Sequence, residues 1–231
     1  MDVVKVLKHQ CVTIISMDYY YNVLSAPCRA GMLTAKAVEI ELNLKPVDLL
    51  AGKEQLADVL TLNPQHTLPT LVDGDFVLWE SSPICTYLAT KYGKTDSLYP
   101  RDAKTCATVN RLLYFDLGTL YRRFGDYAFP PLCMGTEVEP HKLDLLQEAL
   151  RWLNQFLAGH EWAVGNNITV ADIVLVATVS TIEAAGVDLS MHDNVVSWLE
   201  RCKSTLPGYT EVNQPGVEEF AKTAEDKLKK L

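Results

Sequence analysis

The sequence predicts a small α/β layer followed by a domain made only of helices. From residue 17 to about residue 92, segments of strand and helix character alternate in the order strand, helix, strand, hairpin, helix. A short crossover of this kind implies a parallel pair of strands with helices covering the sheet, in a layer of about 75 residues. Turn-forming residues then fill 94–101, and helical spacing continues to the end. We therefore expect domains at 17–93 and 102–231, joined by a linker at 94–101.

The first domain begins with a buried strand that runs directly into a helix. Three consecutive tyrosines, 19–21, favour the strand, and Ser25 is a favoured N-cap residue. Pro27 suits the first turn of the helix, where its missing N–H costs nothing. Apolar residues at helical spacing predict that this helix extends over 27–42.

The rest of the first domain alternates short strands and helices. Pro46 places the next strand at the edge of the sheet, where a missing N–H is tolerated. The expected elements are an edge strand at 44–50, a polar helix at 51–62, a loop at 63–66, strands at 67–72 and 76–79 joined by a turn at 73–75, and a helix from 80 to 92 capped within the stretch Glu80, Ser81, Ser82 and Pro83.

The second domain is predicted to be a helical bundle with one buried central helix. Thr169 and Asp172 have the spacing of a capping box before an apolar run at 173–179. We interpret Asp172 as a structural capping residue, and the helix that it begins as the centre of the domain. The expected helices are at 102–130, 138–157, 169–185, 192–204 and 215–229.

The composition indicates a soluble globular protein that binds neither nucleic acid nor membranes. Of the 231 residues, 48% are hydrophobic and 22% are charged, and no apolar run approaches the length of a membrane span. The 29 Asp and Glu outnumber the 21 Lys and Arg, which argues against a nucleic-acid partner. Cysteines and histidines lack metal-ligand spacing, so we expect free thiols, no metal and a reducing cytoplasmic compartment. The cysteines are at 11, 28, 85, 106, 133 and 202, and the histidines at 9, 66, 141, 160 and 192.

Residues 1–16 are interpreted as an extension of the first domain. Basic residues interrupt their apolar run, and no small-residue cleavage site follows, so a signal peptide is not indicated. Because the first predicted strand begins at Met17, translation could equally begin at this residue. We expect residues 1–16 to be dispensable for folding and activity.

Ser25 is the candidate functional residue of the first domain. A helix N-terminus carries unpaired N–H groups and a partial positive charge, so an anion such as a thiolate would be stabilised beside it. Cys28 follows at the spacing of a Cys-x-x-Cys motif, but Ser25 replaces the first thiol and excludes disulfide exchange by a thiol pair of the chain itself. Two interpretations remain open: Ser25 only caps the helix, or it hydrogen-bonds a thiol supplied by a ligand. Cys28 is expected to be a packed residue.

Four motifs, at 25–29, 63–71, 78–81 and 112–121, resemble those of cytosolic glutathione S-transferases, specifically the insect delta class. They occur in the order of that family and span the chain from 17 to about 220. The resemblance implies a thioredoxin-like N-terminal domain, an all-helical C-terminal domain, a cytoplasmic homodimer and a cis peptide bond before Pro69.

The resemblance also assigns a glutathione site. It implies that the Ser25 hydroxyl donates to the glutathione sulfur and that the Leu68 backbone pairs with the cysteinyl unit. Glu80 and Ser81 would hold the γ-glutamyl group, and His66 would contact the glycyl end.

Two positions of this site depart from the delta-class pattern. Ser82 stands where an arginine is usual, and Glu54, which follows Lys53, stands where a histidine is usual. Because glutathione is an anion, losing two cationic or donor groups should weaken its binding. We expect a higher glutathione KM than in typical members of the class.

By position, eight residues resemble the hydrophobic wall that receives the second substrate. Ordinary helix packing is the alternative explanation for each of them. They are Ala26, Pro27, Tyr121, Phe124, Phe129, Leu132, Cys133 and Phe220.

The function implied is conjugation of glutathione to small hydrophobic electrophiles in detoxification, with glutathione as co-substrate and no metal. The alternative is a ligand carrier with little or no transferase activity, or a protein with glutathione peroxidase-like activity.

Overall fold

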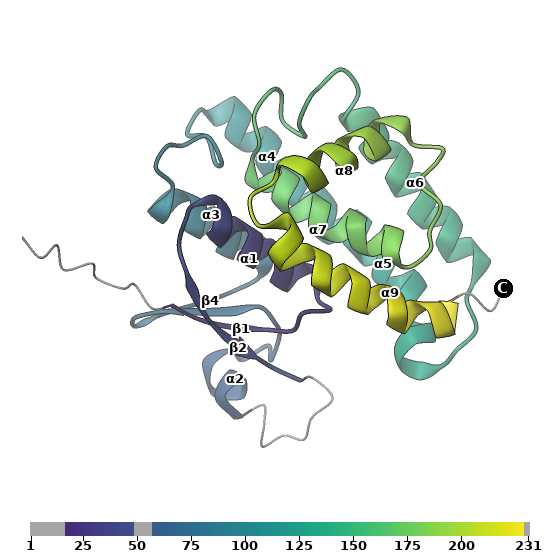
Figure 1. Ribbon diagram of the computed structural model, residues 1–231, viewed down its shortest axis with the longest axis horizontal. Coiled ribbons are helices and arrows are strands. Elements are labelled where there is room, and N and C mark those ends of the chain that lie inside the picture. Colours follow the sequence, from purple (N-terminus) through teal and green to yellow (C-terminus); the bar gives the residue numbers. More distant parts are fainter. Residues whose placement is uncertain (1–16, 49–56, 229–231) are drawn as a thin grey trace, which may run out of the picture.

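The computed structural model describes residues 17–48 and 57–228 and confirms the predicted fold class (Figure 1). A four-stranded sheet with three helices is followed by helices alone. Helices α1 and α3 lie on the side of the sheet that faces the second domain, and α2 lies on the other side. The predictions for residues 1–16, for Glu54, for the end of the strand at 44–50 and for the start of the helix at 51–62 fall outside the described residues.

The sheet has the order β2-β1-β3-β4, with β1 and β2 parallel and the other pairs antiparallel. The strands are β1 (Met17–Tyr21), β2 (Leu42–Pro46), β3 (Thr70–Asp73) and β4 (Phe76–Trp79). Pro46 does lie on an edge strand, as predicted, but the predicted limits of two strands are wrong. The edge strand begins at Leu42, which pairs with Met17, rather than at residue 44. The strand predicted from 67 begins at Thr70, because the preceding Pro69 has no N–H for a ladder.

The helices of the first domain are α1 (Ala26–Ala37), α2 (Ala57–Leu62) and α3 (Ser81–Tyr92). Helix α1 ends five residues before the predicted limit of 42. Glu39 adopts a left-handed backbone conformation, with a φ of 58°, which ends the helical path and turns the chain into β2. This early end lets a short crossover join the two parallel strands.

The second domain is helical throughout, but the predicted continuous helix at 102–130 is interrupted. One π-helical turn interrupts it at 116–120, and a second follows its end, beginning with Pro130 and Pro131, which have no N–H to continue an α-helix. The elements are α4 (Ala103–Phe115), η1 (Asp116–Leu120), α5 (Tyr121–Phe129), η2 (Pro130–Met134), α6 (Pro140–Phe156), α7 (Val170–Ala184), α8 (Asp193–Thr205), η3 (Tyr209–Asn213) and α9 (Gln214–Leu228).

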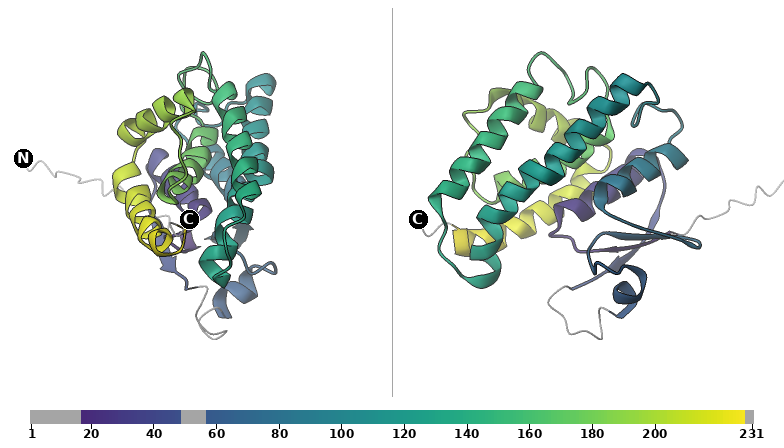
Figure 2. Two further views of the ribbon diagram at one scale, coloured as in Figure 1. Left: turned by 90° about the vertical axis from the view of Figure 1, so that its right-hand side faces the viewer. Right: turned by 180° about the vertical axis from the view of Figure 1, so that it is seen from behind.

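Helix α7 is the buried centre of this domain, as predicted. Thirteen of its 15 residues are buried, and it lies between α4 to α6 on one side and α8 and α9 on the other (Figure 2). Asp172 accepts hydrogen bonds from Thr169 N at 2.9 Å, Ala163 N at 2.7 Å and Trp198 Nε1 at 2.9 Å. Its role is therefore structural, and the predicted capping box is confirmed.

The two domains meet along α1, which lies against α7 and beside η3. Gly216, in the first turn of α9, allows that helix to approach closely. A Cβ atom there would lie 2.3 Å from the Val23 carbonyl oxygen and 2.6 Å from Arg29 Cδ. Because a backbone oxygen cannot swing aside, the close approach requires glycine.

We expect Gly216→Ala to lower the free energy of unfolding by about 2 to 3 kcal/mol through overpacking. Gly118→Ala is the matched control, since a Cβ at Gly118 meets nothing within 4 Å and the backbone φ is not positive. It should be neutral or raise stability by about 0.5 kcal/mol. Urea unfolding measures both, and equal effects of the two variants would contradict the close approach.

Candidate active site

Ser25 caps α1, as predicted. Its backbone is extended, with φ −78° and ψ 113°, and its Oγ accepts a hydrogen bond from Cys28 N at 3.4 Å. This bond uses an oxygen lone pair and leaves the hydroxyl hydrogen to donate either to the neighbouring Cys28 sulfur or to a ligand. The side chain is partly exposed. Ser25 therefore presents a donor to solvent at the positive end of a helix.

The loop before Ser25 is fixed by Asn22, which the sequence analysis did not identify. Asn22 Oδ1 accepts from Leu24 N at 3.0 Å, its carbonyl accepts from Ser25 N at 3.1 Å, and its Nδ2 donates to Val47 O at 3.1 Å. These bonds tie the cap to the end of β1 and to the residue after β2. An Asn in the turn before a helix cap is the signal that could have identified it.

Cys28 is a packed residue rather than a reactive thiol. It is fully buried, and its sulfur accepts a hydrogen bond from Asn22 N at 3.5 Å. Burial raises the pKa of its thiol to about 11, although a hydrogen bond between the Ser25 hydroxyl and the Cys28 sulfur opposes this effect. The thiol is therefore protonated at neutral pH and is a poor nucleophile.

The loop containing His66 and Leu68 is held by the buried side chain of Asn63. Its Nδ2 donates to Thr67 O at 3.0 Å and to Thr70 Oγ1 at 3.1 Å. The Leu68–Pro69 peptide bond is cis, as predicted. Leu68 is half-buried and His66 is exposed. Asn63 was also missed as a supporting residue, because its role depends on contacts that form only in the folded loop.

Glu80 occupies the N-cap of α3, within the predicted capping stretch. Its backbone has φ 71° and ψ 121°, and its side chain makes no capping bond. A residue other than glycine in this region costs about 1 to 3 kcal/mol, and such conformations concentrate at functional sites. Ser81 and Ser82 form the first turn, where backbone N–H groups have no partner within the helix. The turn thus offers a second set of donors and an exposed carboxylate.

The strand register brings these segments to one end of the sheet. Tyr20 pairs with Thr70, and Thr70 pairs with Trp79. Since β1 and β4 run in the same direction, the Ser25 loop and Glu80 both follow strands at this end, and Pro69 precedes Thr70 there (Figure 1). The structure thus gathers Ser25, Leu68, Glu80 and their neighbours on one edge of the first domain.

The eight residues of the predicted hydrophobic wall differ in exposure. Ring centroids are 6.1 Å apart for Tyr121 and Phe129, and 6.0 Å apart for Phe124 and Phe220. Phe124 is fully buried and supports the others from behind, whereas Phe129 is 37% exposed. Among the remaining members, Ala26, Leu132 and Phe220 are buried, Pro27 and Tyr121 are half-buried, and Cys133 is exposed.

The far end of this wall is tied to α9. Lys227 Nζ donates to the Leu132 carbonyl oxygen at 2.5 Å. Leu132 lies in η2, and Phe220 lies two turns before Lys227 on α9. The bond therefore joins two segments of the wall that are 95 residues apart in sequence.

Asp116, in η1, is a buried acid close to the wall. Its Oδ1 has no hydrogen-bond partner within the described residues. Burial raises the pKa of its carboxyl to about 7, although the Thr178 hydroxyl lowers it in part. Burial raises the pKa of Tyr121, and the nearby Cys28 and Asp116 add to this effect.

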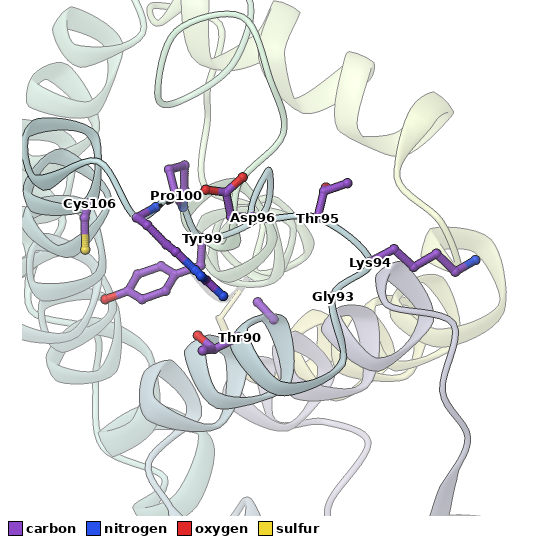
Figure 3. Close-up of a pocket in the computed structure, with 10 residues that line it drawn as sticks. Thr90, Gly93, Lys94, Thr95, Asp96, Tyr99, Pro100 and Cys106 are labelled. Atoms are coloured by element: carbon purple, nitrogen blue, oxygen red, sulfur yellow. Dashed lines mark hydrogen bonds between the residues drawn. The ribbon is translucent and has the colours of Figure 1, made fainter.

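A separate cavity of about 460 Å³ lies between the end of α3 and the start of α4. Figure 3 shows Tyr99 and Cys106 on the α4 side and Thr90 on the α3 side, with Lys94 directed away. It includes none of the residues predicted to bind glutathione or the second substrate. Its position next to the linker separates it from the Ser25 edge of the sheet.

Two further searches covered only residues 17–48 and 57–228. No group of three or more His, Cys, Asp or Glu side chains is arranged to hold a metal ion in this part of the chain. Within the same ranges, every helix is too short or too polar to cross a membrane.

The fold and the helix-cap site define a two-domain protein in which an α/β layer presents a donor beside a helical domain. Residues 16–90 match the glutathione S-transferase N-terminal domain, and residues 121–205 match the glutathione S-transferase C-terminal domain. The chain belongs to the glutathione S-transferase family, and its α/β layer is therefore the thioredoxin-like domain of that family.

In sequence and in structure, the chain is similar to insect delta-class members of this family. It is 44% identical to glutathione S-transferase D7 of Anopheles gambiae, over 91% of this chain and 97% of that protein. A delta-class glutathione transferase of Nilaparvata lugens is 46% identical, with a TM-score of 0.87 over 91% of this chain and 99% of the other. A glutathione transferase homologue of Drosophila mojavensis with bound glutathione is 32% identical, with a TM-score of 0.85 over 92% and 97% of the two chains.

Asp116→Asn should remove a pH-dependent loss of stability. The folded-state pKa of about 7 lies above the ordinary unfolded value near ~3.9, so folding holds a proton that the unfolded chain releases. The free energy of unfolding should therefore fall as the pH rises from about 4 to about 7, and stay low above it. The variant should lack this decline and exceed the wild type in stability above about pH 7. Urea unfolding across this range measures the effect.

Asp126→Asn provides the control, because Asp126 is an exposed carboxylate on α5 that pairs with Arg122. It should leave the pH dependence of unfolding nearly unchanged. An Asp116→Asn profile parallel to that of the wild type would contradict the assignment.

Proposed function

We propose that this protein conjugates glutathione to small hydrophobic electrophiles, with Ser25 stabilising the glutathione sulfur as a thiolate. The observation that carries the proposal is the Ser25 hydroxyl, which caps α1 through its oxygen and keeps its hydrogen for donation. Family membership supports the transferase activity, and the Drosophila mojavensis homologue was solved with bound glutathione.

Stabilising the glutathione thiolate requires only a modest free energy. A free thiol titrates near ~8.5, and lowering its pKa by about two units is worth about 2.7 kcal/mol. A hydroxyl hydrogen bond to the thiolate and the N-terminus of α1 supply contributions of this size. Ser25 makes no covalent bond in this scheme. The sulfur attacks the electrophile by substitution or addition, and catalysis comes from charge stabilisation and alignment.

Besides Ser25, six residues form the tripeptide site in this proposal. The Glu80 carboxylate binds the γ-glutamyl ammonium, while the Ser81 hydroxyl and first-turn N–H groups bind its carboxylate. The Leu68 backbone pairs with the cysteinyl unit, in the manner of an added strand. His66 contacts the glycyl end, and Ser82 is a weaker neutral substitute for the arginine expected beside Ser81. Glu54 belongs to the proposed site on the resemblance alone.

The electrophile binds against Tyr121, Phe129 and Phe220, in contact with Ala26 and Pro27 in the first turn of α1. The buried back of the wall and its exposed margin are formed by the remaining members, Phe124, Leu132 and Cys133. An apolar surface between two domains is a frequent site for small hydrophobic ligands. Detoxification of such electrophiles is the biological role that we propose.

We further propose that the protein is a homodimer. Tyr114 and Leu117 lie one helical turn apart, and their side chains are 73% and 51% exposed. Large apolar side chains exposed together on a helix favour an interface with a partner.

A ligand carrier with weak or no transferase activity, or a protein with glutathione peroxidase-like activity, is the second candidate. The observation that favours it is Ser82, whose neutral side chain leaves the first turn of α3 without the usual cation. Poor retention of glutathione would direct the protein toward binding other compounds. The two candidates differ in whether Ser25 is required for turnover.

Ser25→Ala should lower kcat for chlorodinitrobenzene by about 100-fold to 1,000-fold, because the thiolate loses its donor. Glutathione affinity should change little, since the other contacts remain. The pKa of the bound thiol, followed by thiolate absorbance, should rise toward that of free glutathione. Steady-state kinetics and equilibrium titration of glutathione measure the two effects.

Ser204→Ala, on the exposed side of α8, is the matched serine control and should retain wild-type kinetics. If Ser25→Ala and the wild type both bind glutathione and neither turns over substrate, the carrier interpretation is correct. Equal turnover by the two proteins would exclude Ser25 as the catalytic residue.

Ser82→Arg should lower the glutathione KM about fivefold, because it restores a cation beside the γ-glutamyl carboxylate, worth about 1 kcal/mol. Ser82→Gln, which is long but uncharged, is the control and should change KM much less. The kcat of both variants should stay close to that of the wild type. An unchanged KM for Ser82→Arg would show that position 82 does not face the anion.

A further inference from the structure

Arg29 is a buried arginine whose positive charge has no carboxylate partner. Its side chain is 0% exposed. The guanidinium donates to Asn213 Oδ1 at 2.9 Å, to Val23 O at 2.7 Å, to Thr181 Oγ1 at 2.5 Å and, at 3.5 Å, to Ala177 O. All four acceptors are neutral. Within residues 17–48 and 57–228, no Asp or Glu carboxylate oxygen lies within 4.0 Å of an Arg29 side-chain nitrogen, which is the limit for an ion pair.

This arrangement is costly for folding. Removing a charge from water is compensated poorly by neutral acceptors. Burial lowers the pKa of Arg29 to about 10, so the guanidinium still carries its charge at neutral pH. A neutral amide could make several of the same hydrogen bonds without the desolvation cost of a charge. Hydrogen bonding alone therefore does not explain why a charged side chain occupies this position, and the charge must have another role.

The charge lies close to Ser25. Arg29 follows Ser25 by four residues, which is about 6 Å along a helix axis. Helical side chains lean toward the N-terminus, and the bond to Val23 O places the guanidinium beside the residue two before Ser25. From these constraints, the charge is roughly 10 Å from the Ser25 hydroxyl.

No neighbouring ionisable group cancels this charge. The groups that couple to Arg29 are Tyr121, Cys28 on the same helix and Tyr209 from η3. Burial raises the pKa of all three, so each is neutral at physiological pH. Asp116, the buried acid of η1, forms no ion pair with Arg29. The field of the guanidinium therefore reaches the N-terminus of α1 uncompensated.

We propose that Arg29 is a positioning residue whose uncompensated charge, added to the N-terminus of α1, favours the thiolate form of glutathione bound at Ser25. The inference rests on the proposed function, because it concerns the sulfur that Ser25 holds. A unit charge about 10 Å away, at an effective dielectric constant of about 20, shifts a pKa by about one unit.

Asn213→Asp gives the sharpest test, because it cancels the charge without removing Arg29. An aspartate has nearly the shape of asparagine and keeps the acceptor for Arg29 Nε. Its carboxylate can also accept from Ser180 Oγ, which lies 3.0 Å from Asn213 Nδ2. We expect the pKa of the bound glutathione thiol, measured by thiolate absorbance, to rise by about one unit. Arg29→Gln should give a similar rise, and Arg29→Lys a smaller one.

Thr181→Val is the control for a purely structural role. It removes a hydrogen-bond acceptor of Arg29 but no charge, so it should lower stability and leave the thiol pKa at the wild-type value. Glutathione titration confirms saturation of each variant before the pKa is measured. Should Arg29→Gln fail to fold, Asn213→Asp and Arg29→Lys still decide the question.

A wild-type thiol pKa in Asn213→Asp would overturn the proposal, as would a shift in Thr181→Val as large as that in Asn213→Asp. Ser25→Ala separates this failure from failure of the proposed function. If Ser25→Ala raises the thiol pKa and Asn213→Asp does not, only the inference about Arg29 is wrong. If Ser25→Ala leaves the thiol pKa unchanged, the proposed function itself is wrong.

Discussion

The double burial of α1 is the constraint on which the rest of the structure depends. One side of the helix lies on β1, where Tyr19 OH donates to Cys28 O at 2.8 Å and a Cβ at Gly31 would lie 2.1 Å from that hydroxyl oxygen. The opposite side lies against α7. A helix fixed on both sides cannot rotate or slide, so the direction of its N-terminus is fixed with it. The location of Ser25 is a result of this packing rather than of the loop alone.

Much of this organisation could be predicted from local sequence. Ser25 with Pro27, Thr169 with Asp172, and Pro46 each carry a signal within a few residues, and each has the predicted structural role. Local signals are reliable here because caps and edge prolines depend on backbone donors close in sequence.

The features that sequence could not predict arise from distant contacts or unusual backbone conformations. Arg29 reads as an ordinary polar residue of an amphipathic helix, and its burial depends on partners 148 to 184 residues away. No characteristic residue types mark the π-helical turns, or the left-handed conformations of Glu39 and Glu80, in the sequence. Asn63 acts through side-chain bonds within its own loop, and in sequence it cannot be distinguished from an asparagine of any surface loop.

The bond between Lys227 and the Leu132 carbonyl has a consequence for divergence within this fold. It connects the end of α9 to the rim of the apolar wall without passing through α1 or the sheet. Under the proposed function, changes in the sequence of the last turns of α9 would therefore alter the surface that receives the electrophile and leave the Ser25 end of α1 unchanged. In that proposal, substrate selectivity depends on one domain and thiolate stabilisation on the other, so each can change without the other.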